Sequence, residues 1–230
     1  MAALNHMQGA KDRVYKTIKE RIISLDLKPG DVLSDRKLSE ELKVSRTPVR
    51  EALNLLQKEN FVRQQHGRGF CVSEISLKNI EDLYDVRIVL EAAALRQAAQ
   101  KDVTTLVGKM EQVLRRHSDL VKNLKPKGTF FEDAEFHKTF AAMSENQYLF
   151  EILKSILERI EMLRNIEEIS RQRVLVALEQ HSKVFDFFKK GLYKESEQAL
   201  CEHLQDSKEN VLNRIRSRFQ IVYFEDSAKS

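Results

Sequence analysis

The sequence predicts a mainly α-helical protein in two parts: three helices with a β-hairpin, followed by an all-α bundle. Apolar residues recur at helical spacing through most of the 230 residues, which is the primary signal for amphipathic helices. A glycine-bearing stretch before Ile75 alternates apolar and polar residues as strands do. From Ser76 onward glycine is scarce and the only proline is Pro126, which favours long helices.

The first two helices are marked by their apolar spacing and by their ends. The segment "DRVYKTIKERIISLDL" places Val14, Ile18 and Ile22 on one face, and the Pro-Gly turn of "LKPGDVL" follows it. In "SDRKLSEELKV", we expect Ser34 to cap a short helix that turns Leu38 inward. The stretch after it is long enough only for a tight helix-to-helix corner.

The third helix starts in "VSRTPVREAL", with a proline inside its first turn. If Ser45 is the N-cap, its hydroxyl can accept a bond from an early backbone N–H. Pro48 costs little there, because those N–H groups have no acceptor within the helix. Arg46 and Arg50 project from another face than the apolar one. Such an exposed helix N-terminus suits a polyanion, whereas the alternative is an ordinary solvated face. The apolar face carries Val49, Ala52, Leu53 and Leu56.

The segment "FVRQQHGRGFCVSEI" has apolar and polar residues alternating on both sides of a glycine-bearing tip, which is the pattern of a β-hairpin. Three helices followed by a hairpin predict a winged helix-turn-helix, a fold that binds DNA. Charge agrees with this interpretation. The 39 Lys and Arg residues divide as 14 up to Ile75 and 25 beyond, and the 35 Asp and Glu residues as 10 and 25, so the excess of +4 lies in the first part.

The second part is expected to be a compact helical bundle with its own core. We therefore predict two domains, residues 8–75 and residues 76–225. The six expected helices cover, approximately, residues 77–100, 102–123, 129–144, 146–166, 168–190 and 193–222.

Several classes of protein are disfavoured by composition. There is no apolar run of about 18 residues and no apolar stretch at the N-terminus, so we expect neither a membrane span nor a signal peptide, and we expect a cytoplasmic protein. Cys71 and Cys201 are far apart and lack CxxC spacing, so neither a disulfide framework nor a zinc knuckle is indicated.

Longer segments resemble a known family. The run "LKPGDVLSDRKLSEELKVSRTPVREALNLLQKENFVRQQHGRGFCV" closely resembles the DNA-binding domain of the GntR family of bacterial transcription regulators. The segments "DLYDVRIVLEAAALRQAA", "EDAEFHKTFAAMSENQYL" and "EQHSKVFDFFKKGLYKESEQALCEHL" resemble the effector domain of its FadR branch, the FCD domain. Six helices in the second part are more similar to the shorter VanR-type group.

The resemblance implies that double-stranded DNA is contacted from the second helix, the start of the third helix and the wing tip. Carried over by motif position, the DNA-contacting residues are Arg36, Arg46, Thr47, Arg50, His66 and Gly67. At the tip, small side chains would let the backbone approach a narrow minor groove, where a positive side chain such as Arg68 is favoured. One recognition helix offers too few contacts for specific affinity, so we also expect a homodimer that binds a short inverted-repeat operator.

A second set of residues predicts a metal site. Asp133 and His137 are four apart on one helical face, and His181 and His203 lie on two later helices. One carboxylate and three imidazoles suit a divalent ion such as Zn²⁺, Ni²⁺ or Mn²⁺, among which spacing alone does not choose. The resemblance implies the same four ligands, whereas His6 and His117 fall outside its pattern and are expected to be ordinary histidines. Glu132 and Glu135 should point to other faces.

Arg87, in "DVRIVLE", has two interpretations. It points into the bundle and holds the carboxylate of a small organic acid effector, or it pairs with Glu91 four residues later. Taken together, the predicted DNA-binding fold, the metal site and the resemblance favour a ligand-responsive transcription regulator and not an enzyme. A metal-dependent hydrolase or oxygenase fused to a DNA-binding domain is the alternative, but the sequence lacks HExxH or a comparable constellation. A purely structural metal is a third possibility.

Overall fold

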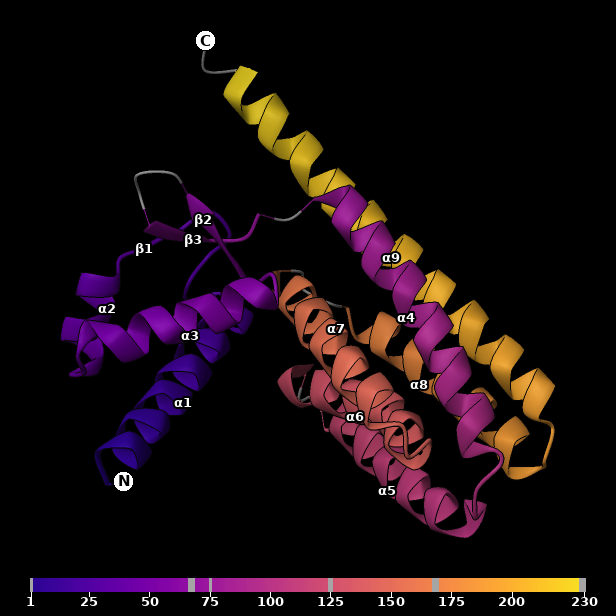
Figure 1. Cartoon of the computed structure of the whole chain (residues 1–230). Helices are drawn as coiled ribbons and strands as arrows, with labels where there is room; N and C mark the ends of the chain where they lie inside the picture. The colour runs from indigo at the N-terminus through magenta and orange to yellow at the C-terminus, as the bar shows by residue number, and fades with distance from the viewer. Residues whose placement is uncertain (1, 66–68, 75, 124–125, 167–169, 228–230) are drawn as a thin grey trace. The chain divides into compact units, whose positions relative to one another are not determined.

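The computed structural model describes residues 2–65, 69–74, 76–123, 126–166 and 170–227. Two compact units make up the chain, the first containing residues 1–75 and 161–166 and the second residues 76–160 and 167–230. A small sheet belongs to the first unit and the second is helical, as Figure 1 shows. The predicted fold class, a winged helix-turn-helix followed by an all-α domain, is confirmed.

Among the described residues, the first unit contains helices α1 to α3, the last residues of α7 and a three-stranded antiparallel sheet of order β1-β3-β2. The register pairs Val62 with Val72 and Leu33 with Phe70, so β1 extends the β2–β3 hairpin by one strand. The hairpin tip, residues 66–68, lies outside the described residues. The elements are α1 (Ala2–Ile23), β1 (Val32–Leu33), α2 (Asp35–Leu42), α3 (Arg46–Lys58), β2 (Val62–Gln65) and β3 (Gly69–Val72).

The starts of these helices differ from expectation in two details. Helix α1 begins at Ala2, well before the segment that its apolar spacing marks. Ser34 caps α2 as predicted, by accepting a bond from the Lys37 amide at 3.3 Å. Ser45 is indeed the N-cap of α3, but the predicted hydroxyl bond is wrong, because its side chain makes none. The third helical residue is Pro48, which has no N–H to donate to a capping hydroxyl.

Packing of α1 against α3 forms the core of the first unit. The predicted apolar faces are both inside, since Ile18 and Ile22 on α1 and Leu53 and Leu56 on α3 are fully buried. At the edge of this contact, the Tyr15 hydroxyl donates to the Glu59 carboxylate, which also pairs with Lys19. Burial raises the pKa of Tyr15 to about 12, so the phenol keeps its proton.

The second unit is a bundle of long helices, and their number and approximate limits match the prediction. Helices α4 and α9 run side by side in opposite directions (Figure 1). Helix α8 also packs on α9, α6 packs on both α4 and α5, and α5 contacts α8. The helices are α4 (Leu77–Ala98), α5 (Val103–Lys122), α6 (Pro126–Met143), α7 (Gln147–Ile166), α8 (Arg171–Lys189) and α9 (Tyr193–Ser227).

An apolar core occupies one end of this bundle. It includes Leu95 of α4, Phe140 of α6, Leu153 of α7, Phe188 of α8 and Leu204 of α9. The rings of Phe140 and Phe188 meet edge to face with centroids 5.2 Å apart. Because these side chains fix the helices relative to one another, polar side chains in the next turns are held in defined positions.

Replacing Leu53 by alanine should lower the free energy of unfolding by about 2–5 kcal/mol, because its fully buried side chain would leave a cavity. Denaturant unfolding of the full chain measures the change. The neighbouring exposed residue supplies the control, and Asn54→Ala should alter stability by less than about 0.5 kcal/mol. Equal stability of the two variants would contradict the packing of α3.

Candidate functional site

One candidate surface lies at the start of α3. Arg46, Thr47 and Arg50 are all exposed, whereas the next apolar residues of the same helix are buried. Arg50 Nε lies 3.1 Å from Asp35 Oδ2 of α2, and Arg36 Nε lies 3.0 Å from Glu40 Oε1. These ion pairs are solvent-exposed, so exchanging them for contacts with another anion costs little. The other predicted DNA contacts, His66, Gly67 and Arg68, lie outside the described residues.

A second candidate site lies inside the helical unit. His137 of α6, His181 of α8 and His203 of α9 are all buried, and one ring nitrogen of each lies within 4.8 Å of the others. The Nε2 atoms of His181 and His203 are 3.1 Å apart. Phe136 stacks on the His181 imidazole with centroids 4.0 Å apart, which fixes the plane of that ring. Three helices therefore bring three imidazoles together, as the sequence predicts.

The Asp133 carboxylate borders this histidine cluster. It is 5% exposed, and its oxygens lie 4.0 Å from His137 Nε2 and 3.7 Å from His181 Nε2. Asp133 precedes His137 by one helical turn, so the backbone of α6 presents both side chains to one place. The four residues predicted as ligands are thus neighbours in the fold.

Glu91 is a buried residue of this site. Its contact with His137 was not expected from the sequence. Its Oε2 lies 2.5 Å from His137 Nδ1, and its Oε1 accepts a bond from Arg87 Nε at 2.6 Å. A carboxylate at this distance accepts the Nδ1 proton, which leaves the lone pair of His137 on Nε2. That Nε2 atom is buried without a hydrogen-bond partner among the described residues, as a metal-binding nitrogen would be before a metal is added.

Arg87 is fully buried on α4, and its predicted pairing with Glu91 is present. Only Nε takes part. The two terminal nitrogens of the guanidinium are buried and have no hydrogen-bond partner within the described part of the chain. The Tyr84 ring lies 5.5 Å from the guanidinium carbon and supports its flat face. Two parallel N–H donors thus remain, the arrangement that binds a carboxylate in a bidentate manner.

Burial keeps the three imidazoles neutral. It lowers the pKa of His203 to about 3, and the neighbouring His137 adds to this effect. The pKa of His181 falls well below its usual value through burial and the proximity of His203. The pKa of His137 is also lowered by burial, against the opposing charge of Glu91. Neutral imidazoles are the form that binds metals, so no proton must leave before binding near pH 7.

Glu91 is ionised, in contrast to the three neutral histidines. Burial favours its protonated state, but the charge of Arg87 and the hydrogen bonds from His137 and Arg87 outweigh burial and lower its pKa to about 2. Glu91 is therefore an ionised acceptor inside the bundle.

The other predictions for this region have clear outcomes. Glu132 pairs with Arg116 and Glu135 with Lys138, so both point away from the histidine cluster as expected. His117 is outside the group of three, yet it is buried, with its ring centroid 5.9 Å from that of His181. Sequence spacing did not indicate this proximity, because His117 lies on α5 with no ligand spacing to another histidine.

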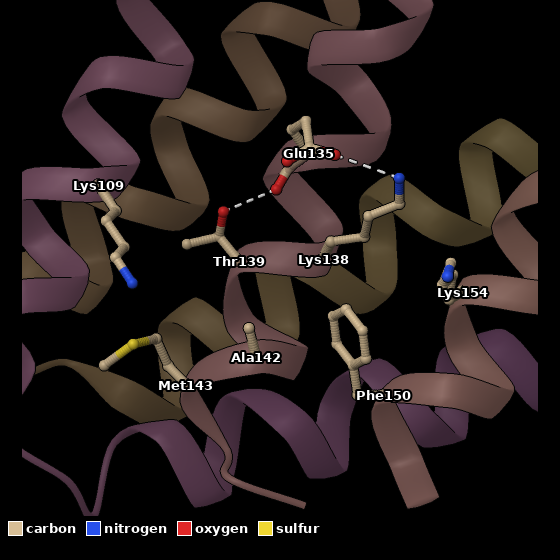
Figure 2. A pocket seen from close by; sticks show the side chains of 8 residues that line it. All are labelled: Lys109, Glu135, Lys138, Thr139, Ala142, Met143, Phe150 and Lys154. Atoms are coloured by element: carbon tan, nitrogen blue, oxygen red, sulfur yellow. Dashed lines mark hydrogen bonds and ion pairs between the residues drawn. The ribbon is translucent and has the colours of Figure 1, made fainter. Parts of the chain in front are cut away.

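A hollow of about 390 Å³ opens on another face of the bundle (Figure 2). Side chains of α5, α6 and α7 line it, and none of them belongs to the histidine cluster. Glu135 within it accepts a bond from Lys138 at 3.2 Å, as Figure 2 shows. The lining residues are Lys109, Glu135, Lys138, Thr139, Ala142, Met143, Phe150 and Lys154.

A helix-turn-helix unit with a wing is a fold that binds DNA, and here it is joined in one chain to a helical unit with a buried polar site. The chain belongs to the GntR family of bacterial regulatory proteins: the description "Bacterial regulatory proteins, gntR family" matches residues 10–72, and the "FCD domain" matches residues 82–206. It is therefore a transcriptional regulator that binds DNA, and not an enzyme.

Relatives that are named as transcriptional regulators match most of the chain. The Nta operon transcriptional regulator of Aminobacter aminovorans is 29% identical over 205 residues, which is 89% of this chain and 96% of that protein. The HTH-type transcriptional repressor RspR of Escherichia coli is 26% identical over 211 residues, covering 90% and 91%. The solved structure of E. coli McbR/YncC has the same fold, with a TM-score of 0.77 at 20% identity over 90% of this chain and 98% of that one. Among the described residues, no helix is long and apolar enough to cross a membrane.

Acidification should destabilise the metal-free protein through these histidines. Their pKa values in the folded state lie below the value of about 6.5 in the unfolded chain, so the unfolded chain binds more protons as the pH falls below about 7. One histidine that stays neutral when folded accounts for about 1.4 kcal/mol of lost stability between pH 7.5 and 5.5. Denaturant unfolding at both pH values should show that His203→Gln loses less stability than wild type by about this amount. An unchanged pH dependence would contradict the buried neutral state of His203.

Proposed function

We propose that this regulator responds to a small carboxylate effector, which binds at a divalent metal held by the histidine cluster and thereby alters operator binding. The observation that carries the proposal is the buried group of three imidazoles, in which His137 Nε2 has no hydrogen bond among the described residues, together with two guanidinium nitrogens of Arg87 that also have none and that are connected to His137 through Glu91. Buried polar atoms are otherwise almost always hydrogen-bonded, so their grouping at one place indicates a binding site.

In this proposal the metal is held by Asp133, His137, His181 and His203. Nitrogen and oxygen donors of this kind suit Zn²⁺, Ni²⁺ and Mn²⁺, and four protein ligands leave a position open on a five- or six-coordinate ion. When bound, the metal would supply a positive charge that attracts an anionic oxygen donor. The lowered pKa values of the three histidines support the assignment, because each imidazole is in its metal-binding form.

Arg87 would bind the effector from the other side. Its terminal nitrogens can take a carboxylate in a bidentate manner, while Glu91 keeps the guanidinium in place through Nε. A carboxylate bound there would compensate a desolvated positive charge, so the proposal accounts for two otherwise unsatisfied donors. Because an arginine fork prefers planar anions with two oxygens, small organic acids are the expected class.

On the DNA side, we assign contacts to Arg36, Arg46, Thr47 and Arg50, together with His66, Gly67 and Arg68 of the wing. The exposure of the first four supports this assignment. One α3 helix offers few contacts, so we expect a homodimer on an inverted-repeat operator, acting in the cytoplasm. Effector binding would change the relative populations of two arrangements of the dimer, and its differential affinity for them would supply the energy.

Arg46→Ala and Arg50→Ala should each weaken operator binding by about 1–3 kcal/mol without loss of fold, because each removes a charge-assisted contact. An operator isolated from a random DNA library, expected to be an inverted repeat, serves as the probe in a fluorescence anisotropy titration. Arg96→Ala on α4 removes an equally exposed arginine and should bind like wild type. Wild-type affinity of both α3 variants would show that the α3 face is assigned wrongly.

His181→Ala and His203→Ala should lose the metal and the carboxylate response together, while keeping the fold and part of the DNA affinity. Elemental analysis of the purified variants and a carboxylate titration of their DNA complexes give the two readouts. His117→Ala is the matched control, because it removes a buried imidazole outside the group of three and should retain the metal. A metal-free variant with undiminished carboxylate affinity would exclude this mechanism, whereas unfolding on metal removal without a change in response would indicate a structural metal.

A further inference from the structure

A chain of hydrogen bonds leads from the histidine cluster to the edge of the bundle. His203 Nδ1 lies 2.8 Å from Gln180 Oε1, and Gln180 Nε2 donates to Asp206 Oδ2 at 3.0 Å. The same oxygen of Asp206 pairs with Arg173 at 2.7 Å. Helices α8 and α9 each contribute two residues to this series of hydrogen bonds and one histidine to the histidine cluster. The role of the series follows from the direction of each hydrogen bond.

Asp206 determines which way the Gln180 amide faces. The Asp206 carboxylate is paired with Arg173 and also accepts from Asn210 Nδ2, so it offers only acceptors to Gln180. The NH₂ group of Gln180 must therefore face Asp206, and its carbonyl oxygen must face His203. A carbonyl oxygen accepts and cannot donate, so the proton of the neutral His203 ring lies on Nδ1. The lone pair of His203 is then on Nε2, the atom that points at His181.

We propose that Gln180 is a positioning residue of the metal site: its amide, oriented by Asp206, holds His203 with the proton on Nδ1 and the lone pair of Nε2 directed at the metal. This inference rests on the proposed function and adds to it a residue that does not touch the metal. It also assigns different supports to two ligands, since His137 is held by the ionised Glu91 and His203 by a neutral amide.

The neutral amide of Gln180 affects the charge of the metal site differently from a carboxylate. A carboxylate beside a ligand imidazole raises the basicity of the ring, whereas an amide fixes orientation and adds no charge. The site already contains the carboxylates of Asp133 and Glu91 against the positive charge of Arg87. With Gln180, His203 is oriented without a third negative charge, which leaves the bound metal more attractive to an anion.

The test uses the full-length chain and Zn²⁺ alone, in competition with a chromogenic chelator. Gln180→Met keeps the length of the side chain and removes the acceptor, so it should bind Zn²⁺ about 10–100-fold more weakly, the usual effect of losing such a support. Gln180→Glu combined with Asp206→Asn, whose amide can donate to the new carboxylate, restores an acceptor for His203 and should recover most of the affinity. Gln205→Met, the same change on the exposed side of α9, is the control and should match wild type.

A second readout separates positioning from general stability. Nitrogen NMR of the metal-free protein should show His203 protonated on Nδ1 in wild type and in the double variant Gln180→Glu with Asp206→Asn, and a mixture of tautomers in Gln180→Met. If Gln180→Met does not fold, Asp206→Asn provides the same test, because an asparagine amide can donate to Gln180 and let its amide reverse.

The possible outcomes distinguish this inference from the function on which it rests. Zn²⁺ binding by wild type, combined with unchanged affinity and an unchanged His203 tautomer in the folded variants, would overturn the role of Gln180 alone. Absence of Zn²⁺ binding by wild type would overturn the proposed function as well. Weaker binding in Gln180→Met together with loss of the single tautomer would establish the positioning role.

Discussion

The desolvation of a polar cluster inside the helical bundle is the constraint on which the second unit depends. Arg87, Glu91 and His137 are almost fully buried, and each would be costly there by itself. The Glu91 carboxylate offsets this cost by bonding Arg87 and His137 at once. The compensation is incomplete, because His137 Nε2 and the terminal nitrogens of Arg87 lack partners among the described residues. A buried donor or acceptor left unpaired costs about 1–3 kcal/mol, and binding a metal and an anion would recover this free energy.

The residues of the buried site come from four helices, so a ligand bound there would contact several helices and affect how they pack. Arg87 and Glu91 come from α4, Asp133 and His137 from α6, and one histidine each from α8 and α9. The apolar core that includes Leu95 and Phe188 fixes these helices at one end of the bundle, so filling the site would alter their positions mainly around the cluster. A ligand that prefers one arrangement of the helices can then change the population of DNA-binding states by its difference in affinity.

Much of this arrangement could be predicted from sequence because it follows helical periodicity. Spacing alone marked the buried face of α3 and placed Asp133 and His137 on one side of α6. Ser45 is the N-cap as predicted, but its hydroxyl bond was predicted wrongly, since Pro48 at the third helical position has no N–H to donate. Neither the bond between Gln180 and His203 nor the position of His117 could be predicted, because each depends on how two helices are rotated about their axes. Sequence spacing within one helix carries no information on that rotation.

The proposed function requires that the buried histidine cluster binds a metal through which a carboxylate acts on the protein. The decisive measurement is a calorimetric titration of wild-type protein with a panel of small organic acids, once loaded with Zn²⁺ and once freed of metal. We expect one metal per chain, at least one acid that binds the loaded protein, and a large loss of that affinity when the metal is removed. Equal affinity for the acid in both forms would rule out a role of the metal and would leave Arg87 to bind the effector by itself.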